Sequence, residues 1–197
     1  MTSSNSVNVN LNVSKTVQQF AEQYVNYYQK IHGVLPQVEQ DEQWPSPCEQ
    51  NKTKNGAALL DGHVFWQPSV ITSEQLSFVN VESALNTSLH EDIKNYFTSI
   101  YSESLEAQCE DGKLSLLFAW NEDDFQRLQE NIIGHILMKQ RLKQPITVFF
   151  AVTDEEDTII SFDNDSGAVW VERVGCKPHK KLTDSIVDFI NMLEPVA

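Results

Sequence analysis

The stretch ITVFFAVTDEEDTIISFDNDSGAVWVERV, residues 146–174, decides the fold. It contains three runs rich in apolar, β-branched and aromatic residues, at 146–152, 158–162 and 168–174, and residues of these types favour strands. Between the runs lie DEED at 154–157 and DNDSG at 163–167, which are typical of turns. Short connections join antiparallel strands, whereas parallel strands need a long crossover. The stretch therefore predicts an antiparallel meander.

Helices and a hairpin are predicted on both sides of this meander. Immediately upstream, WNEDDFQRLQENIIGH at 120–135 has Asn121 as a candidate N-cap and apolar residues at helical spacing, including Phe125 and Ile132. A β-hairpin is predicted at 104–120 and a strand at 64–66. The first helix is expected to begin near Thr16 and to end at Gly33, and residues 34–55 are expected to form a loop. Further helices are predicted at 81–85, capped by Asn80, at 89–100, capped by Ser88, and at 182–193.

This order of elements predicts an α+β fold, with a largely antiparallel central sheet flanked by helices. A chain of 197 residues is long enough for one domain with a sizeable core. We expect residues 1–14 to be a flexible polar N-terminus and residues 15–197 to form a single domain.

The charge of the chain limits its partners. It has 28 Asp and Glu against 14 Lys and Arg, a net charge of −14, and residues 39–126 hold 16 acids and 4 bases, a net of −12. Nucleic acid is a poor partner because phosphate binding needs a basic surface. A bare anionic membrane should repel the chain too. A basic protein surface is the natural complement.

Targeting and chemical motifs are not found in the sequence. The N-terminus lacks the basic start and apolar core of a secretory signal, and the apolar run 148–152 is far shorter than the roughly 20 residues of a membrane span. Cys48, Cys109 and Cys176 form no CxxC pair, which indicates reduced thiols. The five histidines have no metal-ligand spacing. We expect a soluble cytoplasmic protein without a metal, cofactor or catalytic group.

The three adjacent acids Glu122, Asp123 and Asp124 have two interpretations. Acids in the first turn of a helix stabilise it by about 0.3–1 kcal/mol each, and one or two would be enough. The alternative is a site for a positively charged partner. Trp44, in a proline-rich loop, is the tryptophan most expected to be exposed, whereas Trp66 and Trp120 are expected in the core.

Residues 120–135 resemble the signature region of the SecY-interacting protein Syd family. Further matches follow the family's order: PSPC at 45–48, WQP at 66–68, KQRLK at 139–143, and Glu155 with Glu156. The resemblance covers nearly the whole chain and implies a single Syd-like domain at 15–197, similar in fold to the Smi1/Knr4-like (SUKH) domains. It also implies a non-enzymatic bacterial protein that binds the cytoplasmic face of SecY. Such a protein would be loosely associated with the cytoplasmic side of the inner membrane and would monitor or modulate translocon assembly.

The charge of the chain provides a physical reason for SecY as the partner. Cytoplasmic loops of membrane proteins are enriched in Lys and Arg, so an acidic protein would reach the membrane indirectly, through SecY. Asp124 is expected to serve mainly the helix terminus, and Glu155, Glu156 and Asp157 join the site only if their turn lies on the same side. The predicted partner-binding residues are Trp44, Glu122, Asp123, Asp124, Glu130, Glu155, Glu156 and Asp157.

Two other functions stay open at this point. A SUKH-type immunity protein would neutralise a basic toxin through the same kind of acidic surface. An enzyme would use Glu122, Asp123 or Glu130 as acid or base, and a reaction lost in Asp123→Asn with binding unchanged would indicate it.

Overall fold

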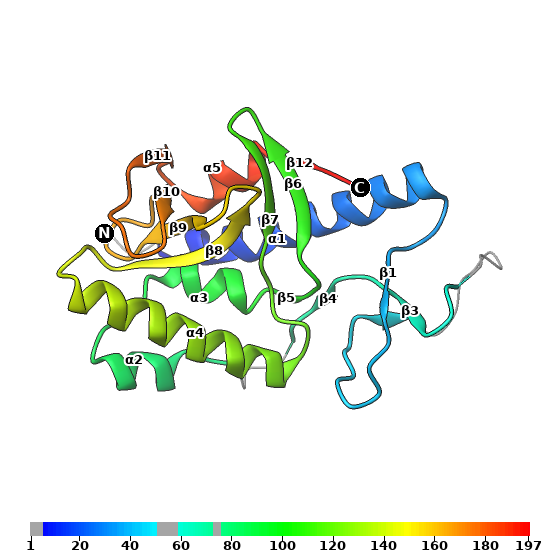
Figure 1. The fold of residues 1–197 in the computed structure, drawn as a ribbon, viewed down its shortest axis with the longest axis horizontal. Helices are drawn as coiled ribbons and strands as arrows, with labels where there is room; N and C mark the ends of the chain where they lie inside the picture. The colour runs from blue at the N-terminus through cyan, green and yellow to red at the C-terminus, as the bar shows by residue number, and fades with distance from the viewer. Residues whose placement is uncertain (1–5, 51–58, 73–75) are drawn as a thin grey trace.

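The centre of the fold is a seven-stranded antiparallel sheet with the order β11–β10–β9–β8–β7–β6–β12 (Figure 1). The computed structural model describes residues 6–50, 59–72 and 76–197, with side chains from Val13 onward. The sheet is curled, and helices flank it. Its strands are β6 (Leu105–Cys109), β7 (Gly112–Leu116), β8 (Thr147–Thr153), β9 (Thr158–Asp163), β10 (Val169–Arg173), β11 (Lys180–Thr183) and β12 (Glu194–Pro195).

The helices lie in two groups around this sheet (Figure 1). Helix α4 (Glu122–Arg141) contacts β8 and is covered by α2 (Val79–Leu85), while α1 (Ser6–His32) contacts α3 (Glu91–Phe97) and α5 (Ile186–Asn191). The apolar face of α4 follows the predicted spacing, because Phe125, Ile132 and Ile136 are all buried. One hydrophobic core therefore joins both groups of helices to the sheet.

Two small sheets lie beside the central one. Strand β3 (His63–Trp66) pairs antiparallel with β1 (Gln37–Glu39) and β2 (Glu49–Gln50), and β4 (Ser69–Val70) pairs with β5 (Ile100–Tyr101). Trp66, on β3, links the small sheet to the rest of the fold. Its ring stacks on Tyr24 of α1, with 6.3 Å between centroids, and meets Trp120 edge-on at 6.1 Å. This aromatic contact fixes the β1–β3–β2 sheet relative to the start of α4.

A buried polar network fastens α4 to the sheet. Lys139 and Glu172, both with fully buried side chains, form an ion pair with 2.7 Å between Nζ and Oε2. The Thr147 hydroxyl donates a hydrogen bond of 2.8 Å to Glu172 Oε1, and His135 Nε2 lies 3.2 Å from that hydroxyl. Burial, and next the nearby Lys139 charge, lower the pKa of His135 to about 4. His135 is therefore a neutral, buried residue near neutral pH.

The locally encoded elements are confirmed. The meander, the hairpin, the strand at 64–66 and the Asn121 cap are all present. Helix α1 ends at His32, and Gly33 takes the positive φ of 74° expected at a helix end. The fold class is confirmed as a single α+β domain with a largely antiparallel sheet flanked by helices.

Several predicted boundaries are wrong, and tertiary contacts explain the largest error. Helix α1 begins at Ser6 instead of near Thr16. Val13 is fully buried, and the Ser14 hydroxyl donates to the carbonyl of Asn95, so packing on α3 holds this turn of the helix. Residues 6–14 of the predicted flexible segment 1–14 are thus helical, and residues 1–5 lie outside the described part of the chain.

The other errors concern caps and short strands. Phe78 and His90, instead of Asn80 and Ser88, occupy the N-caps of α2 and α3. Leu182 lies on strand β11 and not in a helix, since α5 begins after its cap Ser185. The predicted loop 34–55 contains β1 and β2, while its residues 51–55 lie outside the described part.

Candidate functional site

The N-terminus of α4 is fixed by a set of short polar contacts. The Asn121 side chain accepts a hydrogen bond of 2.8 Å from the Asp124 amide, and its own amide group donates to the carbonyl of Pro45 at 2.9 Å. Asp124 Oδ2 accepts a hydrogen bond of 2.9 Å from the Trp120 amide. Asp124 therefore does serve the helix terminus, as predicted, and the same contacts attach the proline-rich loop to α4.

This loop places Trp44 next to α4. The Ser46 hydroxyl donates a hydrogen bond to the Trp120 carbonyl, and the Arg127 guanidinium lies over the Trp44 ring, 4.0 Å from its centroid. A cation over an indole face is attracted by the ring quadrupole. Trp44 is half-buried, so its ring is held in place while part of it stays open to solvent.

Cys48 ends this loop and is buried. Its side chain is fully buried, and burial raises the pKa of the thiol to about 11, only partly opposed by a hydrogen bond from Ser46. A thiol with this pKa is protonated near neutral pH, and the thiolate is the reactive form. Cys48 is part of the core instead.

Between the loop, the small sheet and α4 lies a hollow of about 270 Å³. Two indole rings and five carboxylates dominate its wall, and they come from three separate stretches of the chain, 39–49, 103 and 120–124. The lining residues are Val38, Glu39, Asp41, Trp44, Glu49, Glu103, Trp120 and Asp124. We call this site the acidic hollow.

Several carboxylates of the acidic hollow accept hydrogen bonds from backbone amides, but in the described part of the chain none of them is paired with a cation. Asp41 accepts from the Gln43 amide and Glu49 from the Ser46 amide. Among the described residues, none of the five acids forms an ion pair with Lys, Arg or His. Burial, and next repulsion from Asp124, raise the pKa of Glu103. The hollow thus disfavours further negative charge.

The structure brings together part of the predicted site. Trp44 and Asp124 line the acidic hollow, and Glu122 and Asp123 are exposed in the same first turn of α4. The charge of Glu122 also contributes, after burial, to a raised pKa of Tyr101. Glu130 is exposed two turns further along α4 and does not line the hollow.

The acidic turn after β8 lies elsewhere. Thr153, at the end of β8, pairs with Leu114 near the start of β7, whereas α4 follows the other end of β7. Glu155, Glu156 and Asp157 are all exposed on that turn. Glu155 instead shares a second hollow with Asp111 and Lys180. The condition for including this turn in the site is therefore not met.

Most of the residues that line the acidic hollow were not predicted from the sequence. The acids Glu39, Asp41, Glu49 and Glu103 were not singled out, although the net charge of −12 over residues 39–126 was a signal for them. Trp120 was expected in the core, like the buried Trp66, but it is half-buried and lines the hollow. Which acids converge depends on the β1–β3–β2 sheet, which the sequence did not predict.

The chemistry of the acidic hollow suits an organic cation. Carboxylates form charge-assisted hydrogen bonds with ammonium and guanidinium groups, and indole faces attract the same groups. In the described part of the chain, no group of three or more His, Cys, Asp or Glu side chains is arranged to hold a metal ion. Within those residues no helix has the length and apolarity to cross a membrane.

The fold defines a single-domain α+β protein, and its surface carries the acidic hollow. Residues 14–195 match the family model described as Syd protein (SUKH-2). The chain therefore belongs to the Syd family. It is 57% identical over 192 residues to "Protein Syd" of Colwellia psychrerythraea, which covers 93% of each chain. It is 42% identical over 186 residues to "Protein Syd" of Alteromonas mediterranea, covering 94% of this chain and 98% of that one.

Proposed function

We propose that this protein binds the cytoplasmic face of SecY, with the acidic hollow receiving Lys or Arg side chains from its basic cytoplasmic loops. One observation carries the proposal: five carboxylates and two indole rings line one hollow, and no ion pair neutralises those carboxylates in the described structure. In this function the protein has no catalytic group and no cofactor. It monitors or modulates translocon assembly.

Charge also explains how such a protein selects SecY over the lipid around it. Cytoplasmic loops of membrane proteins carry an excess of Lys and Arg, whereas the cytoplasmic leaflet is anionic and repels a chain of net charge −14. Complementary charges raise the association rate and fix orientation. Association with the inner membrane is then indirect and loose, because it depends on the protein loops alone.

The direct test is binding to SecY in nanodiscs over a series of salt concentrations, beside empty nanodiscs of the same lipid. We expect binding that requires SecY and weakens steeply between low and physiological salt, since the Debye length falls to about 8 Å there. No binding to SecY at low salt would overturn the proposal.

Charge reversal locates the contact surface. Glu122→Lys with Asp123→Lys should weaken SecY binding about tenfold at low salt, since exposed ion pairs are each worth up to about 1 kcal/mol. The matched control is Glu155→Lys with Glu156→Lys, which has the same change in net charge at the other end of β7. Equal losses in both variants would mean that net charge, and not the surface at the start of α4 beside the hollow, decides binding.

The immunity function predicts a different partner. A basic toxin would bind the same hollow, and the charge-reversed pair at 122 and 123 would then weaken toxin neutralisation while SecY binding is absent from the wild type. The SecY proposal is preferred because the chain belongs to the Syd family.

A further inference from the structure

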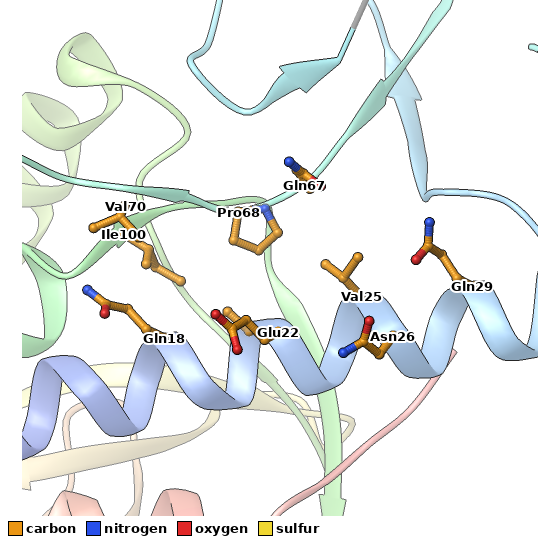
Figure 2. Close-up of a pocket in the computed structure, with 10 residues that line it drawn as sticks. Gln18, Glu22, Val25, Asn26, Gln29, Gln67, Pro68, Val70 and Ile100 are labelled. Atoms are coloured by element: carbon orange, nitrogen blue, oxygen red, sulfur yellow. The ribbon is translucent and has the colours of Figure 1, made fainter. Parts of the chain in front are cut away.

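A groove beside α1, separate from the acidic hollow, has no role in the proposed function. It runs along one face of α1, between that helix and the segment 67–70, and has a volume of about 470 Å³. Figure 2 shows Gln18, Glu22, Val25, Asn26 and Gln29 in sequence along the helix and Pro68 opposite them. It shares no lining residue with the hollow. We call it the α1 groove.

The polar side chains of the α1 groove are free to bind a ligand. The groove is lined by five polar side chains, and none of them forms a hydrogen bond or ion pair with another described residue. The amides of Gln129 and Gln144, in contrast, donate to backbone carbonyls. Between them lies an apolar floor that includes Ala21, Val25 and Ile100. The five are Gln18, Glu22, Asn26, Gln29 and Gln67.

We propose that the α1 groove binds an extended peptide segment with a Lys or Arg opposite Glu22. Each side-chain amide offers both a donor and an acceptor, which matches the alternating N–H and C=O groups of an extended backbone. From Gln18 to Gln29 the helix rises about 16 Å, the length of about five extended residues. Small apolar side chains would rest on the floor.

Charge and shape select this occupant over others. Glu22 is the one charged residue in the lining, and a carboxylate only accepts, so it pairs best with a cation. The lining has no aromatic ring, so a sugar would find no ring on which to stack. An anionic peptide would be repelled by Glu22 and by the protein's net charge of −14.

A displayed library of random octapeptides tests the proposal without a known partner. The library is selected on the wild-type protein after depletion on Asn26→Lys, which places a long cation in the middle of the groove. Gln23→Lys is the matched control, because Gln23 is also exposed on α1 but does not line the groove. Selected peptides are then synthesised and titrated by fluorescence anisotropy and by amide chemical shifts in NMR.

The expected result is a set of peptides with one basic residue among β-branched or small ones. Asn26→Lys should weaken their binding at least about tenfold and Gln23→Lys less than twofold. Glu22→Gln should weaken binding about threefold, the scale of one exposed ion pair, and only while the basic residue is present. Shifts should map to α1 and residues 67–70.

Three outcomes overturn the proposal. The library yields no peptide that prefers wild type to Asn26→Lys, or shifts map to the acidic hollow, or a glycan array gives groove-dependent binding where peptides give none. None of these outcomes bears on SecY binding, which is tested by the charge reversal at 122 and 123. Failure of one proposal is therefore distinct from failure of the other.

Discussion

Replacing Lys139 by Met should destabilise the protein strongly, although Met has a similar length and is apolar. Lys139 Nζ lies 2.7 Å from Glu172 Oε2, 2.7 Å from the Cys176 carbonyl and 3.3 Å from Gln144 Oε1, and it is fully buried. Without it, the Glu172 carboxylate keeps the Thr147 hydroxyl as its donor. Leaving one charge of a buried ion pair without its partner lowers the free energy of unfolding by about 3–5 kcal/mol.

The double variant Lys139→Met with Glu172→Gln isolates the charge as the cause. A glutamine at this position retains an oxygen acceptor for Thr147 but has no charge, so we expect a cost of only about 1–2 kcal/mol, the scale of lost hydrogen bonds. The second substitution would thus recover about 2 kcal/mol. Urea unfolding followed by tryptophan fluorescence measures both free energies, provided that the m-value is unchanged.

Lys177→Met is the matched control, since it removes the same charge from an exposed residue near the network. It should change the free energy of unfolding by no more than about 0.5 kcal/mol. A double variant as unstable as Lys139→Met, or a single variant within about 1 kcal/mol of the control, would refute the reasoning.

Three further predictions concern the same core and the hollow. Asn121→Ala should cost about 1–2 kcal/mol, because it removes the helix cap and the bond to the Pro45 carbonyl, whereas Asn131→Ala, exposed on α4, should not destabilise. The pKa of His135 is about 4 in the folded protein against its ordinary value of 6.5, so on acidification the unfolded chain takes up the proton first. Stability should fall by up to about 3 kcal/mol as pH falls from 6.5 to 4, and His135→Gln should flatten this dependence in unfolding curves measured across that range. Glu103→Gln should raise the melting temperature at neutral pH, since the raised pKa of Glu103 means that its charge destabilises the folded state there, and it should weaken SecY binding; an unchanged affinity would exclude Glu103 from the site.

The elements that sequence predicted well are those with local signals. The meander depends on strand-forming runs and on the turns between them, and the Asn121 cap lies three residues from the amide that it accepts from. Strands β11 and β12 were missed because they are only four and two residues long. Such strands exist through their pairing with β10 and β6, and nothing in their own composition requires them.

Sites that depend on long-range contacts were predicted in part or not at all. Trp44 and Asp124 could be chosen, because one lies in a proline-rich loop and the other in an acidic helix start. The pairing of Lys139 with Glu172 could not be predicted. The two residues are 33 positions apart, and a lysine near the C-terminus of a helix is typically exposed. Glu103 reaches the hollow only because the fold places it beside Asp124.

The charges of the buried network and those of the acidic hollow differ in whether they are paired, and the contrast supports the proposed function. In the core, Glu172 is matched by Lys139 and hydrogen-bonded by Thr147. In the acidic hollow, Glu103 lies close enough to Asp124 for its pKa to rise, and no cation among the described residues compensates. The charge of Glu103 therefore destabilises the free protein at neutral pH, and a bound Lys or Arg would offset that cost. The protein then gains stability on binding, so low salt and SecY together should raise its melting temperature more in the wild type than in Glu103→Gln.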